Sequence, residues 1–230
     1  KEKYKSFVLI NTTTQRAIGL MDLKGTFVDK GDGWDCYSIN DAEKRMKFVG
    51  YWAQENKVLA NFVMLVHRLS IVFPDKTFVL RPHPGEDPEF YRTVFSGVKN
   101  VHIEKEGSVF SWIMASDIVI HDGCTTAVES FLAEVPIITY KSINDYHYEM
   151  VLPNKFGVQC KTEDEVIEAI DDIYKNPNSF AQIHSLTPLT ASLMKNLQAD
   201  VYDDFIRLCG KLVNEKLNGN DKGGNISVQK

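Results

Sequence analysis

The chain has 230 residues, of which 43% are hydrophobic and 11% aromatic, an ordinary composition for a globular protein with a substantial buried core. It carries 26 Lys and Arg residues against 31 Asp and Glu residues, so its formal net charge is −5. This balance lacks the positive charge that binds a nucleic-acid backbone or an anionic membrane surface. We therefore expect no nucleic-acid partner, and peripheral membrane association only through partner proteins.

Targeting signals and cysteine usage favour a cytoplasmic location. The longest apolar stretches, such as residues 62–66, fall far short of the roughly 20 residues that span a bilayer. The apolar run after the first lysines is also too short for a secretory signal. Cys36, Cys124, Cys160 and Cys209 form no Cys-x-x-Cys pair, which indicates reduced thiols rather than disulfides.

The first half of the chain begins with a short apolar strand and contains one long helix. Residues 6–10 predict a buried strand that stops at a polar cluster, residues 11–15. Residues 19–40 are glycine-containing and aperiodic, which predicts a long irregular connection. From Asp41, a suitable N-cap, apolar residues recur at helical spacing as far as Phe73.

Short strands and helices alternate through the rest of the chain. The predicted strands are 77–80, 100–104, 117–120 and 135–140. The predicted helices are 87–95, a turn from 108, 125–133, a helix after the capping box Thr162–Glu165, and one or two closing helices at 189–217. Continuous apolar strands without hairpin signals predict an α/β fold, a Rossmann-like doubly wound parallel sheet. We assign this domain to residues 1–217, followed by a disordered tail at 218–230.

Three polar clusters stand where predicted strands end. They are residues 11–14, 81–85 and 121–126. In an open parallel sheet, ligands bind beyond the carboxyl ends of the strands, so these clusters are expected to share one edge. Together they offer hydroxyls, two imidazoles, a guanidinium and a glycine at a helix start, which suits an anionic phosphate.

Each candidate ligand group also has a structural interpretation. Gly123 with Thr125 and Thr126 can approach a phosphate closely, but threonine at a helix start is also a common N-cap. Arg81 and His83, held among prolines, fit either a site or a surface turn.

The remaining polar residues near these clusters also have two interpretations each. His121 is either a second phosphate or sugar contact or a buried histidine bonded to the backbone. Glu129 lies one helical turn after Thr125, where it either accepts from a ribose diol or is solvated. Asp122 is either a base or a turn-forming residue.

The sequence motifs support metal binding, thiol catalysis and cofactor binding less well than phosphate binding. His121, Cys124 and a distant His83 do not complete a four-ligand zinc pattern, so we expect no metal. Cys124 as a nucleophile lacks an evident orienting group. Neither Gly-x-Gly-x-x-Gly nor a Walker A sequence is present, so we expect no dinucleotide or other cofactor.

Several motifs resemble those of bacterial surface carbohydrate biosynthesis proteins, over about residues 6–155. They are Asn11-Thr12, Leu80 to Glu86, Glu106 to Val109 with Trp112-Ile113, Ser116-Asp117, His121 to Glu129, and Pro136 to Tyr140. That family is similar to the C-terminal, donor-binding half of GT-B glycosyltransferases. More distantly, bacterial sialyltransferases, Kdo transferases and teichoic-acid polymerases, which use CMP- or CDP-activated donors, carry His-Pro and paired-hydroxyl motifs in the same order.

The resemblance implies that His83, Thr125 and Thr126 hold the phosphate of a cytidine nucleotide, with Arg81 and His121 nearby. It implies a metal-independent glycosyltransferase for capsule or lipopolysaccharide assembly, with His83 and His121 as the catalytic residues. The expected partners are a nucleotide-sugar, a glycan or glycolipid acceptor, and another domain or chain that carries the acceptor site. Two alternatives are a UDP-sugar 2-epimerase-like enzyme and a non-catalytic nucleotide-binding subunit of a polysaccharide assembly complex.

Overall fold

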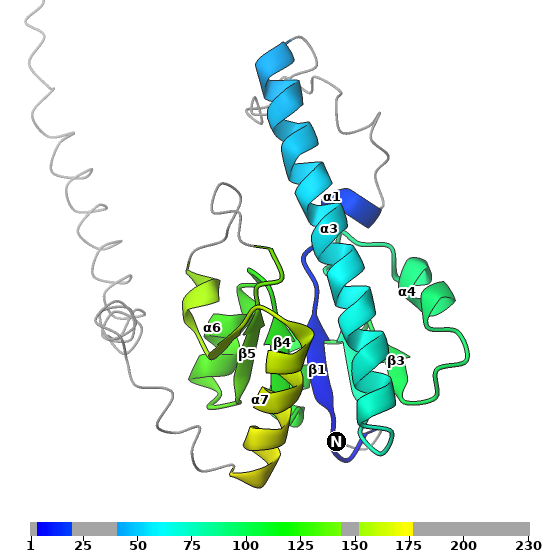
Figure 1. Ribbon diagram of the computed structural model, residues 1–230, viewed down its shortest axis with the longest axis vertical. Coiled ribbons are helices and arrows are strands. Elements are labelled where there is room, and N and C mark those ends of the chain that lie inside the picture. The colour runs from blue at the N-terminus through cyan, green and yellow to red at the C-terminus, as the bar shows by residue number, and fades with distance from the viewer. Residues whose placement is uncertain (1–3, 20–40, 144–151, 177–230) are drawn as a thin grey trace, which may run out of the picture. The chain divides into compact units, whose positions relative to one another are not determined.

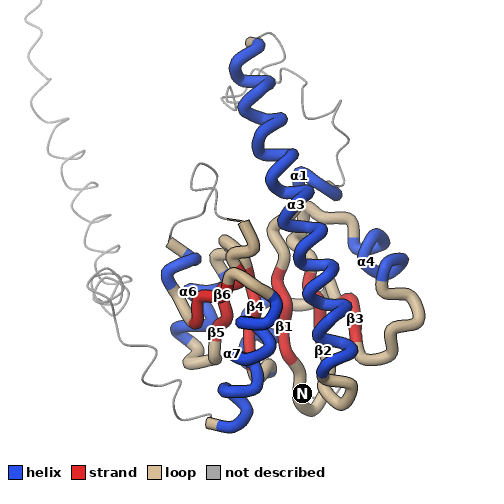
Figure 2. Tube along the Cα trace, viewed as in Figure 1, coloured by secondary structure: helices blue, strands red, loops and turns tan. Residues whose placement is uncertain are grey.

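A computed structural model describes residues 4–19, 41–143 and 152–176, all within one compact unit of the chain (Figure 1). Most of the expected irregular connection at 19–40, the closing helices at 189–217 and the tail at 218–230 lie outside the described residues. The described residues form a sheet with helices on both of its faces (Figure 2).

Six parallel strands make up the sheet, in the order β3-β2-β1-β4-β5-β6. They are β1 (Val8–Asn11), β2 (Phe78–Arg81), β3 (Val101–Ile103), β4 (Ile118–His121), β5 (Ile137–Tyr140) and β6 (Val158–Cys160). The chain steps outward from β1 to β3 and then returns to the other side of β1, so the winding reverses between β1 and β4. This order confirms the predicted doubly wound parallel sheet and places its topological switch point between those two strands.

The described helices agree with the sequence pattern, apart from short pieces that it does not signal. They are α1 (Gln15–Ile18), α3 (Ala42–Val72), α4 (Pro88–Val94), α5 (Val109–Ala115), α6 (Thr126–Leu132) and α7 (Glu163–Lys175), with a 3-10 turn η2 (Pro153–Lys155). The predicted caps are confirmed, because the Asp41 carboxylate accepts from two amides of the first turn of α3 and the Thr162 hydroxyl accepts from Glu165 N. The short α1, η2 and β6 were not predicted.

Alternate strand residues pack on opposite faces of the sheet, and each face has its own hydrophobic core. The larger core joins one set of strand residues to α3, α4 and α7, whereas the smaller clusters join the other set to α5 and α6. Val8 and Ile10 point into the first core, and Phe7 and Leu9 point into the second. Burial on both faces explains why these strands are apolar throughout.

The helix α3 is longer than the sheet it covers. Its 31 residues span about 46 Å at 1.5 Å per residue, and apart from Phe48 its buried residues fall between Val58 and Ser70. Figure 1 shows the first half of α3 extending past the carboxyl ends of the strands, next to α1. No helix of the described ranges is both long and apolar enough to cross a membrane.

Candidate functional site

A row of polar residues lies at or next to the ends of four neighbouring strands. Asn11 of β1 pairs in register with Arg81 of β2 and with His121 of β4, and His121 pairs with Thr139 of β5. Residues paired in a parallel sheet point to the same face, here the face that carries α5 and α6. The predicted residues Asn11, Arg81 and His121 therefore lie side by side, while Thr139 was not predicted.

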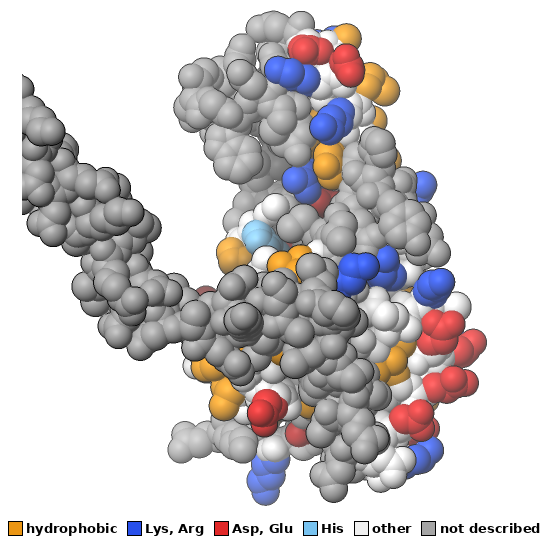
Figure 3. All heavy atoms as spheres, turned by 90° about the vertical axis from the view of Figure 1, so that its left-hand side faces the viewer, with side chains coloured by type: hydrophobic (Ala, Val, Ile, Leu, Met, Phe, Trp, Pro, Cys, Tyr) orange, Lys and Arg blue, Asp and Glu red, His pale blue; other side chains and the backbone are white. Residues whose placement is uncertain are grey.

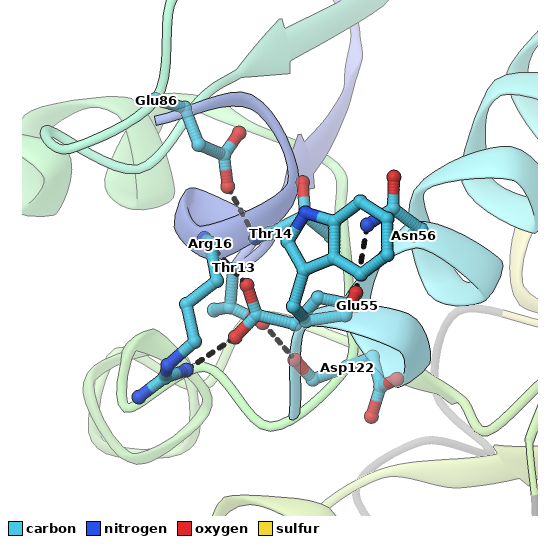
Figure 4. A network of polar contacts seen from close by, with 8 residues as sticks. Thr13, Thr14, Arg16, Glu55, Asn56, Glu86 and Asp122 are labelled. Atoms are coloured by element: carbon cyan, nitrogen blue, oxygen red, sulfur yellow. Dashed lines mark hydrogen bonds and ion pairs between the residues drawn. The ribbon is translucent and has the colours of Figure 1, made fainter. Parts of the chain in front are cut away.

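The segment after β1 is hydrogen-bonded at successive residues to two other loops, and Figure 4 shows the contacts of Thr13 and Thr14. The Thr12 hydroxyl donates to Glu86 Oε2 at 2.6 Å, and the Thr14 amide donates to the other carboxylate oxygen of Glu86. The Thr13 hydroxyl donates to the Asp122 carbonyl at 2.9 Å. These bonds hold the β1 loop against the loops that follow β2 and β4, at the switch point.

A second carboxylate reaches the same segment from α3. The amide of Arg16 donates to Glu55 Oε2 at 2.6 Å, and the Arg16 guanidinium also pairs with the Glu55 carboxylate. Burial raises the pKa of Glu55, although Arg16 opposes this shift. Glu55 therefore holds the start of α1 against the half of α3 that extends past the sheet.

The Glu86 carboxylate is completely buried and is the centre of the loop contacts. Besides Thr12 and Thr14, the Tyr91 hydroxyl donates to it at 3.0 Å. Burial raises the pKa of Glu86, and the hydrogen bonds from these donors counteract that rise. The backbone carbonyl of Glu86 also accepts from Lys105 Nζ at 2.9 Å.

His83 is half-buried in the turn after β2, and its protonation is set by the backbone. The Gly85 amide donates to His83 Nδ1 at 3.1 Å, so Nδ1 carries no hydrogen and Nε2 of the neutral ring carries one. Burial lowers the pKa of His83; Lys105 lowers it further, whereas Glu55 raises it. The ring is thus a neutral imidazole with an N–H donor at Nε2.

Arg81 lies at the expected strand end, but its guanidinium turns toward α5. It donates to the carbonyls of Glu106 and Gly107, the first at 2.8 Å, and lies 5.9 Å from the centre of the Trp112 ring. Burial lowers the pKa of Arg81. The hydrogen bonds of Arg81 therefore hold the loop before α5.

The two threonines at the start of α6 differ in their surroundings. Thr126 is buried, and its hydroxyl accepts from Asn11 Nδ2 at 2.9 Å and donates to Cys124 Sγ at 2.9 Å. Thr125 is exposed, and its side chain makes no capping hydrogen bond to α6. Of the pair, Thr125 is therefore the residue that is exposed to solvent.

The turn that precedes α6 is held by a side chain that the sequence did not single out. Gly123 has a φ of 65°, in the left-handed region that glycine adopts readily. Its amide donates to Asn154 Oδ1 at 2.7 Å, and Asn154 Nδ2 lies 3.4 Å from Asp122 Oδ1. Asn154, which comes from η2, therefore fixes the conformation of the Asp122-Gly123 turn.

His121 is completely buried, and its ring is held by β5. The Thr139 hydroxyl lies 3.0 Å from His121 Nε2 and donates to the Phe156 carbonyl at 2.6 Å. Burial lowers the pKa of His121 to about 3. The structural interpretation of His121 is therefore confirmed as to burial but wrong as to bonding, because the ring contacts the Thr139 side chain and not the backbone. Glu129 is half-buried on α6.

Thiol chemistry and metal binding were the weaker alternatives. Burial raises the pKa of the Cys124 thiol, although its contacts with Thr126 lower it, so Cys124 has little of the thiolate that a nucleophile needs. Among residues 4–19, 41–143 and 152–176, no group of three or more His, Cys, Asp or Glu residues is placed to hold a metal ion. On the face drawn in Figure 3, several Asp and Glu side chains gather at the lower right, below a group of Lys and Arg side chains.

Comparisons with known proteins give likenesses of fold at low sequence identity. No family model matches the sequence, and no curated protein is significantly similar to it. UDP-GlcNAc 2-epimerase from Neisseria meningitidis, solved with UDP-GlcNAc, is 14% identical with a TM-score of 0.45, over 80% of this chain and 40% of its own. MnaA from S. aureus, solved with UDP, is 13% identical with a TM-score of 0.47, over 78% of this chain and 39% of its own.

A glycosyltransferase is similar at a lower TM-score. E. coli heptosyltransferase WaaC, solved with ADP, is 11% identical with a TM-score of 0.39, over 74% of this chain and 45% of its own. The chain therefore spans less than half the length of each of these three proteins. At these scores we take the fold from the order and direction of the strands themselves.

Proposed function

We propose that this chain binds the nucleotide of an activated sugar and forms the donor-binding half of a GT-B-like glycosyltransferase. A CMP-linked sugar is the favoured donor, and capsule or lipopolysaccharide assembly is the favoured pathway, both on the resemblance of the sequence motifs. In this proposal the acceptor is a glycan or glycolipid, and its binding site belongs to another domain or chain. Transfer is proposed to proceed without a metal ion.

The convergence of three loops at the switch point is the observation that supports this proposal. The β1 loop is bonded to the β2 loop through Thr12 and Glu86, and to the β4 loop through Thr13 and Asp122. Ligands of doubly wound sheets bind in the crevice at this position. Two residues of these loops, His83 and Thr125, offer neutral donors, which suit a phosphate oxygen.

His83 and Thr125 have the leading roles in this proposal. His83 offers its Nε2–H to a phosphate oxygen, because Gly85 occupies Nδ1. Thr125 is exposed at the start of α6, and its hydroxyl is proposed to donate to the same phosphate. Such donors stabilise the negative charge that grows on a leaving phosphate as the sugar departs.

The other predicted residues are proposed to support these two. Asn11 and Thr126 join the strand end to α6, Thr12 anchors the β1 loop, and Gly123 shapes the turn between His121 and Thr125. Glu129, on the same face of α6 as Thr125, is proposed to accept from the ribose hydroxyls. Arg81 holds the loop before α5.

A thermal-shift panel of CMP, CDP, UMP, UDP and GDP tests the proposal without assuming a sugar. A ligand that binds only the folded state raises the melting temperature according to its affinity, and we expect CMP or CDP to give the largest rise. No shift with any of the five, at millimolar concentration, would contradict nucleotide binding.

Substitution of His83 tests its role in the site. We expect His83→Ala to weaken nucleotide binding by about tenfold to a hundredfold, as for the loss of one hydrogen bond to a charged group, and to abolish sugar transfer. The matched control is His67→Ala, because His67 is an exposed histidine in the second half of α3. Unchanged affinity of His83→Ala in calorimetry, with the control also unchanged, would remove His83 from the phosphate site.

A further inference from the structure

Two buried side-chain acceptors at the switch point have no donor among the described residues. They are Asn11 Oδ1 and His121 Nδ1. The side chains are 3% and 0% exposed, and they belong to residues that pair in register across β1 and β4. A buried polar atom without a partner destabilises the folded state, so two such atoms on adjacent strands call for an explanation.

The hydrogen on His121 can be placed from its neighbour. The Thr139 hydroxyl has one hydrogen, and it donates that hydrogen to the Phe156 carbonyl at 2.6 Å, because a carbonyl can only accept. The contact of 3.0 Å between Thr139 Oγ1 and His121 Nε2 is then a hydrogen bond from the imidazole. His121 is therefore the neutral tautomer with its hydrogen on Nε2, and its Nδ1 is a lone-pair acceptor.

Asn11 is oriented by a similar argument. The Thr126 hydroxyl donates to Cys124 Sγ, so it accepts from the amide group of Asn11, which puts Nδ2 on that side. The Asn11 oxygen is left as the second acceptor. Both free atoms thus offer lone pairs and no hydrogen.

The chemistry of a group that satisfies both atoms follows from their positions. Neighbouring strands lie about 4.8 Å apart, and one atom with two hydrogen bonds of about 2.8 Å bridges acceptors up to about 5.6 Å apart. The bridging atom must therefore carry two hydrogens, as does a water oxygen or the amino nitrogen of a base such as cytosine. A phosphate, which at neutral pH presents lone pairs, would be repelled.

We propose that Asn11 Oδ1 and His121 Nδ1 form one buried acceptor site, which binds a neutral donor with two hydrogens on one atom and excludes phosphate. His121 is then a positioning residue, and the phosphate belongs to His83 and Thr125. The part of this proposal that concerns a ligand amino group rests on the proposed nucleotide-binding function. The part that concerns water and the tautomer of His121 does not.

High-resolution crystal structures of the full chain, free and with CMP, test the site directly. We expect one atom within hydrogen-bond distance of both Asn11 Oδ1 and His121 Nδ1. A water oxygen there in both crystals identifies solvent, and the cytosine amino nitrogen in the CMP crystal identifies the ligand. An anion at this position, or no atom bonded to the pair in either crystal, would overturn the proposal.

Calorimetry shows in solution whether water or the cytosine amino group occupies the acceptor site. If the amino group occupies the site, CMP binds at least tenfold more tightly than UMP, which has a carbonyl oxygen at that position. If water occupies it, the affinities differ by less than about threefold. When neither nucleotide binds, the proposed function fails, while the free crystal still decides whether the acceptor site exists.

Nitrogen-15 NMR of histidine-labelled protein tests the tautomer. We expect His121 to show a protonated Nε2 and an unprotonated Nδ1, and to keep both in Thr139→Ser, which retains the hydroxyl. Thr139→Val removes the acceptor and should abolish this preference. A protonated Nδ1 in the unsubstituted protein would overturn the proposal even if the valine variant fails to fold.

Discussion

The amide of Gly85 donates to Nδ1 of His83 at 3.1 Å, a contact between residues two positions apart that decides which ring nitrogen can donate outward. By contrast, His121 gives its Nε2 hydrogen to Thr139 and retains a lone pair inside the protein. Two imidazoles, one in the turn after β2 and the other at the end of β4, are thereby given opposite hydrogen-bonding roles. This difference separates the proposed phosphate ligand from the proposed positioning residue.

The titration of His83 provides the first prediction. Burial lowers the pKa of His83, so in the free protein its ring should titrate below the usual value of about 6.5. We expect a phosphate-bearing nucleotide to raise that pKa, because a nearby anion favours the imidazolium form. Proton NMR titration with and without CMP measures both values. A midpoint that CMP leaves unchanged would argue against contact between His83 and the phosphate.

Acid stability gives the second prediction, through His121. Its pKa falls to about 3 in the folded state, against about 6.5 unfolded, so the unfolded chain binds the extra proton between these values. The free energy of unfolding should therefore decrease as pH falls below about 6.5, by at most about 1.4 kcal/mol per pH unit from this residue. Above that pH its contribution is constant.

His121→Gln isolates this contribution, because glutamine does not titrate. Urea unfolding of both proteins at pH 7, 6 and 5 should give a shallower loss of stability for the variant, whatever its starting stability. Parallel curves for the two proteins would show that His121 is protonated in the native state.

The sequence predicted the strands well because of how they are buried. Runs such as Val8 to Ile10 and Ile118 to Ile120 are apolar since both faces of a parallel sheet are covered. The polar residues at their ends were found for the same reason, because Asn11 and His121 mark where the apolar run stops. The strand β6 has only three residues, with Gln159 exposed, so it lacks this signal.

The contacts within the site were less predictable, because they join residues far apart in the chain. Glu86 contacts Thr12 across 74 positions, and Glu55 contacts Arg16 across 39. In the sequence, both glutamates look like solvated residues of a turn and a helix. Likewise, adjacency in Thr125-Thr126 does not reveal that one hydroxyl turns inward to Asn11.

The buried carboxylate of Glu86 supplies the third prediction. Its two oxygens accept from Thr12, Thr14 and Tyr91, and in Glu86→Gln an amide hydrogen would face one or two of these donors. We expect a loss of about 1–3 kcal/mol in the free energy of unfolding at pH 7, together with weaker nucleotide binding, since the β1 loop loses its anchor. Denaturant unfolding and calorimetry measure the two effects.

Glu89→Gln is the matched control for Glu86, because Glu89 lies three residues away and is 67% exposed in an ion pair with Arg92. Exposed pairs of this kind contribute little, so its stability should change by less than about 0.5 kcal/mol. Equal losses in both variants would mean that the Glu86 hydrogen bonds do not stabilise the loop.

The last prediction concerns the approach of β6 to β5. Gly157 has a φ of 72°, and a Cβ atom there would lie 2.2 Å from the Ile137 carbonyl oxygen. Gly97 has a similar φ of 83° but has no atom within 4 Å of such a Cβ. Gly97→Ala should therefore lower the free energy of unfolding by about 1–2 kcal/mol, because alanine is strained in the left-handed region. Gly157→Ala has the same strain and must also displace β6, so it should lower the free energy of unfolding by well over about 2 kcal/mol. Thermal or urea unfolding measures the difference, and equal costs would show that β6 lies farther from Ile137 than described.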